Sequence, residues 1–271
     1  MTKLFLILAC TVLLLAACSE KDKPTDTNIY GYKLDQFVRA DTVRAHVDAN
    51  APAEQDFRSL FAYEIVSSAD GFSPRASSNA GYDLPWSTFR EGFLVPVDSY
   101  RTWFPTFTLP SAFKVTNTGF FRLYRKVDVD NGVHGTKMVE LLGLPAYNMD
   151  NWEGVPEDAI KLADLLQGIA VYDSVMFVAA DAYSKTYQPQ HINDGYYFLD
   201  SEISTFPNFN AAMPNSLKKF KKLSSIVVYG ATSAQNHAFP LAPQSLADLV
   251  FTVPASLEGF ERTIMNSTRK R

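Results

Sequence analysis

Two apolar, strand-like runs, 61–66 and 175–180, each lead into a turn of one pattern: aspartate, a small residue, an aromatic residue and serine. Carboxylate and hydroxyl oxygens at a strand end can contact a polar ligand or a metal ion. The alternative is a structural turn, in which the carboxylate accepts backbone N–H bonds. The candidate ligand-binding residues are therefore Asp70, Ser73, Asp181 and Ser184.

His191 is a further candidate, because it lies three residues before Asp194 and could form an acid–base couple with it. No two of the four histidines have the i, i+4 spacing of a helical metal site. The sequence also lacks Gly-x-Ser-x-Gly, phosphate-loop and His-Glu-x-x-His motifs. We therefore expect neither a catalytic residue nor a metal site, and we place His191 among the ligand-binding candidates.

The N-terminus has a basic residue, Lys3, a short apolar run over 4–15, and then Ala16-Ala17-Cys18. The run is too short to span a bilayer, which needs about 20 residues. This arrangement resembles a bacterial lipoprotein signal, or lipobox. The resemblance implies cleavage before Cys18, lipid on its thiol and acylation of the new amino group. An ordinary signal peptide with a chance cysteine is the alternative.

A lipid on Cys18 predicts a protein anchored in the cell envelope, with the membrane as its first partner. Ser19 after the cysteine implies the outer membrane, facing the periplasm or the surface, if the host is Gram-negative. The polar residues 19–28 predict a flexible tether that reaches roughly 35 Å when extended.

Composition excludes several function classes. The only other cysteine is Cys10, which would leave with the signal, so the folded part has no thiol for catalysis, redox chemistry or metal binding. The formal net charge of −4 argues against nucleic acid as a partner. The hydrophobic content of 46% is ample for a packed core.

The chain also shows signs of an internal duplication. The two Asp-aromatic-Ser turns match, 109–114 matches 213–218, and 32–34 is a weaker match to 137–139, with offsets of roughly 105 residues. Apolar runs predict strands at 120–129, 175–180 and 226–229. Chance similarity of short segments is the alternative. The expected organisation is a signal peptide (1–17), a tether (18–28), a first repeat (29–130), a second repeat (131–233) and a C-terminal extension (234–271).

The order of segments in the second repeat resembles the molybdopterin-binding domain of the sulfite-oxidase-like oxidoreductases. The segments that carry this resemblance are 138–145, 152–155, 162–166, 175–184 and the lysine-rich 217–228. The resemblance implies a strand-rich mixed α+β fold, with two duplicated domains of this type. Catalytic members of the family ligate molybdenum through a cysteine, which the folded part lacks. We therefore expect no cofactor and disfavour molybdopterin.

A crowded aromatic segment offers a second candidate surface, either a platform for a ligand or core filling. Its members are Tyr82, Trp86, Phe89, Phe93, Tyr100, Trp103, Phe104 and Phe107. Together these features predict a non-catalytic binding or assembly lipoprotein whose partner is an envelope protein or a small molecule. The alternative is an enzyme, either a divergent molybdopterin-type oxidoreductase or a hydrolase without a recognisable motif.

Overall fold

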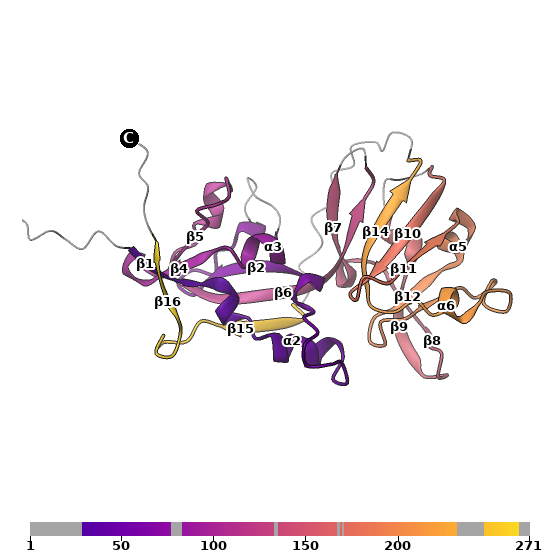
Figure 1. Cartoon of the computed structure of the whole chain (residues 1–271), viewed down its shortest axis with the longest axis horizontal. Coiled ribbons are helices and arrows are strands. Elements are labelled where there is room, and N and C mark those ends of the chain that lie inside the picture. Colours follow the sequence, from indigo (N-terminus) through magenta and orange to yellow (C-terminus); the bar gives the residue numbers. More distant parts are fainter. Residues whose placement is uncertain are drawn as a thin grey trace, which may run out of the picture.

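The computed structural model describes residues 29–76, 83–132, 135–166, 169, 171–231 and 247–265. Two lobes lie side by side, with β1, β2 and β5 in one and β10, β12 and α5 in the other (Figure 1). Their buried apolar residues form two main clusters, one drawn mostly from 32–123 and one from 127–228. The fold is strand-rich with mixed sheets, in agreement with the expected fold class.

Strand β6 (Thr118–Asp130) runs through both lobes. Core residues recur at every second position along it: Phe121 and Leu123 are buried in the first cluster, and Val127 and Val129 are buried in the second. This period of two places one side of the strand against both cores, which we call the core face. The other side is the outer face. The change from the first core to the second therefore occurs inside β6, whereas the expected boundary between the repeats was at residue 130.

An eight-stranded sheet is built around β6, in the order β11-β10-β14-β6-β2-β3, and β7 and β15 also pair with β6. The pairing of β14 with β6 is parallel, and the other pairings in this sheet are antiparallel. The remaining strands are β2 (Phe61–Ser67), β3 (Leu84–Pro85), β7 (Thr136–Glu140), β10 (Ser174–Ala179), β11 (Ser184–Tyr187), β14 (Leu223–Tyr229) and β15 (Leu249–Thr252).

Each lobe adds an antiparallel four-stranded sheet, ordered β16-β1-β4-β5 in the first lobe and β8-β9-β12-β13 in the second. Both small sheets contribute to the same clusters as the core face of the large sheet. Their strands are β1 (Ile29–Lys33), β4 (Phe93–Val95), β5 (Arg101–Trp103), β8 (Ala146–Asp150), β9 (Pro156–Lys161), β12 (Tyr196–Phe198), β13 (Ser204–Thr205) and β16 (Arg262–Met265).

Helices are short and lie between the strands. The α-helices are α2 (Ala40–Val47), α3 (Trp86–Phe89), α4 (Leu162–Leu165), α5 (Pro189–Asp194) and α6 (Asn215–Lys218). The 3-10 turns are η1 (Leu34–Phe37), η2 (Arg58–Leu60), η3 (Pro74–Ala76), η4 (Pro96–Asp98), η5 (Ser111–Phe113) and η6 (Leu141–Gly143).

Four strand pairings of the first lobe correspond to four pairings of the second. The first lobe pairs β1 with β4, β4 with β5, β2 with β3 and β2 with β6. The second pairs β9 with β12, β12 with β13, β10 with β11 and β10 with β14. All eight pairings are antiparallel, and they occur in the same order along the chain. The segment 137–139, expected to match 32–34, lies instead in β7 and pairs with β6.

Two glycines occupy corresponding places in these small sheets. The Gly92 carbonyl accepts the N–H of Leu34 at 3.0 Å, and the Gly195 carbonyl accepts the N–H of Leu162 at 2.9 Å. A Cβ added at either glycine would come within 3.0 Å of the leucine and of a buried phenylalanine, Phe104 or Phe206. A side chain at either glycine would therefore displace the packed leucine and phenylalanine side chains, so this packing favours glycine.

Two buried hydroxyls also correspond. Thr102 Oγ1 accepts the N–H of Val115 at 3.0 Å, and Ser204 Oγ accepts the N–H of Phe220 at 2.9 Å. Each hydroxyl fixes the segment that leads into β6 or β14. The C-terminal strands complete the first lobe, since β15 pairs with β6 and β16 pairs with β1.

Candidate functional site

A cluster of ionisable side chains lies on the outer face of the first lobe, around Arg75 of η3. The Arg75 guanidinium lies 3.9 Å above the ring of Tyr124 and is 2.8 Å from the Asp83 carboxylate. It also forms an ion pair with Glu140, at the end of β7. The Tyr124 hydroxyl donates to Glu64 of β2 at 2.6 Å. We call these five residues the Arg75 cluster.

Burial and like charges hold a proton in the Arg75 cluster. Burial raises the pKa of Asp83 to about 8, and Glu140 and Glu64 act in the same direction, while Arg75 opposes them. The Asp83 Oδ1 atom is buried without a hydrogen-bond partner. A carboxyl that is protonated at neutral pH could donate a proton, which is the property of a general acid.

The second lobe has strand positions that correspond to those of the Arg75 cluster, but the side chains at these positions are uncharged. Val227 and Tyr229 of β14 correspond to Arg122 and Tyr124 of β6, because each lies opposite the matching residue of the neighbouring strand. Where Tyr124 donates to a carboxylate, Tyr229 donates to the sulfur of Met176 at 3.7 Å. The fold therefore does not require charges at these places.

The second lobe also leaves this face uncovered. We call it the open face, and it comprises the outer-face side chains of β6, β7, β10, β11 and β14 beyond Lys126. Every one of them is partly or fully exposed, whereas Ala62, Glu64, Asp83 and Tyr124 of the first lobe are buried. The open face consists of Asp128, Asp130, Thr136, Met138, Ser174, Met176, Val178, Ser184, Thr186, Ser225, Val227 and Tyr229.

Arg125 joins the two lobes on the core face. Its Nε donates to Glu202 Oε1 at 2.6 Å, and its Nη2 donates to Glu202 Oε2 at 3.2 Å. The guanidinium also donates to the carbonyl oxygens of Leu60, Lys126 and Leu223. Five hydrogen bonds match the five donors of an arginine, so the guanidinium has no donor left for a ligand.

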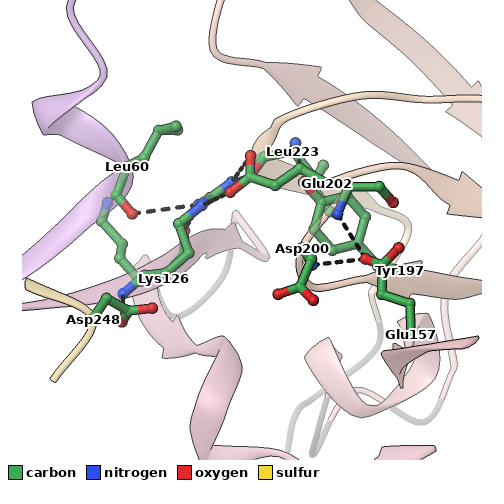
Figure 2. A network of polar contacts seen from close by, with 10 residues as sticks. Leu60, Lys126, Glu157, Tyr197, Asp200, Glu202, Leu223 and Asp248 are labelled. Carbon is green, nitrogen blue, oxygen red and sulfur yellow. Dashed lines mark hydrogen bonds and ion pairs between the residues drawn. The ribbon is translucent and has the colours of Figure 1, made fainter. Parts of the chain in front are cut away.

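A second network supports the loop that carries Glu202. The Glu157 carboxylate accepts the N–H groups of Asp200 at 2.7 Å and Ser201 at 2.6 Å. Figure 2 shows Glu157 and Asp200 beside Tyr197, whose hydroxyl accepts the N–H of Leu223 at 3.0 Å. The seam between the lobes at this point is therefore filled by contacts within the protein.

Asp70 and Asp181 both lie in exposed turns. Asp70 Oδ1 accepts the N–H of Phe72 at 3.0 Å, and Asp181 Oδ1 accepts the N–H of Tyr183 at 3.1 Å. The bond from Phe72, followed by one from Ser67, lowers the pKa of Asp70. These are the bonds of a structural turn.

The two turns are not brought together. Ser67, at the end of β2, lies opposite Thr118, whereas the register of β14 places the end of β10 level with Lys126. The turns are thus about eight residues apart along β6, or roughly 26 Å. Ser73 is buried near the first turn, and Ser184 is exposed at the start of β11.

His191 belongs to the N-terminal turn of α5. Its Nδ1 accepts the N–H of Gln188 at 3.3 Å, and its ring packs edge-on against Phe209 at 4.9 Å. Burial lowers the pKa of His191, with Asp194 acting in the opposite direction. Asp194 itself accepts the N–H of Asn208 at 2.8 Å. The observed contacts of His191 are those of a helix cap.

The aromatic segment divides between core and surface. Trp86, Phe89, Phe93 and Phe104 are buried, and Phe107 is exposed. Tyr82 and Cys18 lie outside the described residues. Within the part of the chain that the structure describes, no group of three or more His, Cys, Asp or Glu side chains is suited to a metal ion.

Sequence reasoning missed Glu64, Asp83, Tyr124 and Glu140 as members of one cluster. Glu64 carried a usable signal, because it is a charged residue inside an otherwise apolar strand, and buried charges are paired. Comparisons with known proteins found no match: no family model, no curated protein and no solved structure matches the chain.

Proposed function

We propose that the chain is a membrane-anchored, non-catalytic binding or assembly lipoprotein of the cell envelope. The observation that carries this proposal is the open face. It presents Met176, Val227 and Tyr229 at the sheet surface, where Met176 and Val227 are partly exposed and the exposed fraction of Tyr229 is 44%. A contiguous apolar surface with a polar rim is typical of a protein-binding site.

The anchor in this proposal is a lipid on Cys18, joined to the first lobe by the tether 19–28. Among the described residues, the structure contains no helix long and apolar enough to cross a membrane. A tether of this length allows the lobes to stand clear of the bilayer, so that an envelope partner can approach the open face.

The proposal includes an internal duplication, in which the outer face of the first copy is covered and the outer face of the second copy is open. Its support is the matched order of strand pairs, the two corresponding glycines and the two corresponding hydroxyls. We further propose that each copy has the sulfite-oxidase-like fold, on the strength of the sequence segments alone. In this view the second copy kept the backbone and changed its outer face into a binding surface.

An enzyme is the second candidate, and Asp83 is the observation that favours it. A carboxyl with a pKa near 8 is a property that general acids share. Asp83 is buried and its carboxylate contacts the Arg75 guanidinium, so a substrate could reach it only after neighbouring side chains moved. If Asp83→Asn abolished a measured activity while the chain stayed folded, the enzyme would be the better reading.

The proposed function is tested by photo-cross-linking in host envelopes. A benzophenone amino acid is placed at Val227 on the open face or, as the control, at Tyr147 on the exposed strand β8. A defined protein cross-linked from position 227 and not from position 147 supports the proposal. Equal products from both positions, or none from position 227, would overturn it.

A further inference from the structure

In the first lobe, a segment of the chain itself covers the part of the outer face that corresponds to the open face of the second lobe. Its β2 and β3 are joined by residues 68–83, and the part that includes η3 lies on the outer face, with Arg75 over Tyr124. In the second lobe, β10 and β11 are joined by the tight turn 180–183. No equivalent segment is therefore available from that connection, and Tyr229 is exposed where Tyr124 is covered.

The chemistry of the open face favours an arginine. Asp130 lies opposite Val227, one strand away from Tyr229, and Asp128 lies opposite Ser225. The open face thus has one carboxylate, that of Asp130, beside the exposed ring, and no member of the face is basic. The Asp128 carboxylate is already paired with the ammonium group of Lys126. A guanidinium is planar, stacks on an aromatic face and pairs with a carboxylate at the same time.

We propose that the open face binds a short peptide segment of a partner protein, and that an arginine of this segment stacks on Tyr229 beside Asp130. The proposal rests on the proposed function and names the chemistry of its partner. The arginine would take the place that Arg75 takes over Tyr124 in the first lobe. Met176, Val227 and Met138 would pack against the apolar part of the segment.

The test uses the chain's own covering segment as the probe. A peptide with the sequence of residues 68–76 and a twin with glutamine at the arginine position are titrated into the full chain in detergent. The chain carries labelled methionine and valine methyl groups, and methyl NMR reports on Met176 and Val227. We expect shifts at both residues, with the glutamine twin binding about fivefold to tenfold more weakly, the loss of one cation–π contact.

Tyr229→Ala should weaken binding of the arginine peptide by a similar factor and leave the glutamine twin unchanged, since only the stacked pair is lost. The matched control is Tyr147→Ala, another exposed tyrosine, which should have no effect. Equal affinities of the two peptides, or no shift up to the solubility limit, would overturn the proposal. A specific cross-link from position 227 would in that case leave the proposed function standing with a different partner chemistry.

Two other occupants give distinct results. Shifts at Met176 and Val227 that grow with protein concentration alone would assign the face to a second copy of this chain. Peptide binding that appears only after residues 232–246 are replaced by a glycine–serine segment of equal length would assign it to those residues. Either result would overturn the proposal.

Discussion

Tyr124 and Tyr229 occupy corresponding places in two antiparallel strand pairs, Tyr124 opposite Ala62 and Tyr229 opposite Ser174. The first hydroxyl donates to the Glu64 carboxylate and the second to the Met176 sulfur. The first ring lies beneath Arg75, and among the described residues no arginine contact is found over the second. The two lobes therefore differ at this place in charge and cover, while the backbone pairing is the same.

Asp83→Asn should change how the free energy of unfolding depends on pH. The pKa of Asp83 is about 8 in the folded chain and about 3.9 when unfolded, so only the folded state binds this proton between those values. Stability from this group therefore falls as pH rises from about 4 to about 8, and the fall stops above that. Across this pH window, the free energy of unfolding of Asp83→Asn should therefore rise relative to that of the parent chain, by at most about 1.4 kcal/mol per pH unit.

Urea unfolding across that pH range measures the difference. Asp70→Asn is the matched control, because its pKa is lowered rather than raised. The contribution of the Asp70 carboxylate to the free energy of unfolding is present at neutral pH and is lost only as the pH falls through the pKa that Asp70 has in the folded chain. A stability difference for Asp83→Asn that stayed constant from about pH 4 to about 8 would contradict the assignment of a protonated carboxyl.

Arg125→Ala should lower the free energy of unfolding by about 3–5 kcal/mol, because it leaves Glu202 buried without its partner. Denaturant titration measures this loss. Arg39→Ala is the control, since Arg39 and Asp41 form an exposed ion pair, whose contribution is screened by solvent, and its loss should leave the free energy of unfolding nearly unchanged. A loss of under about 1 kcal/mol for Arg125→Ala would show that the guanidinium does not hold the lobes together.

Ala182→Gly should raise the free energy of unfolding by about 0.5–1 kcal/mol, because Ala182 has a φ of 67° and glycine adopts this region without strain. The corresponding Gly71 has a φ of 72°, so Gly71→Ala should be destabilising by about 1 kcal/mol. Ala146→Gly, in the exposed strand β8, should lose stability instead. If Ala182→Gly lost stability as Ala146→Gly does, the two turns would not be alike.

Cys18→Ala should abolish metabolic labelling with a radioactive fatty acid and release the chain from the membrane fraction, because the acyl chains provide the anchor. Fractionation and labelling of whole cells measure both effects. Ser19→Ala leaves the thiol in place and serves as the control for lipid attachment. A chain that stayed in membranes after Cys18→Ala would contradict a lipid anchor.

Strand positions could be predicted from the sequence. The runs expected at 120–129 and 226–229 lie within β6 and β14, and the run expected at 175–180 coincides with β10 except for residue 180, which begins the turn. The alternation of β6 was informative because one side of it faces a core in both lobes.

The clusters could not be predicted in the same way. Arg125 and Glu202 are 77 positions apart, and Arg75 and Glu140 are 65 apart. Local patterns carry no information on such pairs, because partner choice depends on how the sheets pair. The turns at the two aspartates could be predicted, because the hydrogen bonds of an Asp turn join residues that are close together in the sequence.

Cysteine protection on the open face tests the central claim most directly, because the only cysteine left after signal cleavage would be the lipidated Cys18. Val227→Cys and Tyr147→Cys are each labelled with a maleimide, in host envelopes and as purified chain, with the parent chain as background. A binding surface on the open face predicts that Val227→Cys reacts at least several-fold more slowly in envelopes than when purified, while Tyr147→Cys reacts equally in both. Equal rates for Val227→Cys in the two preparations would contradict it.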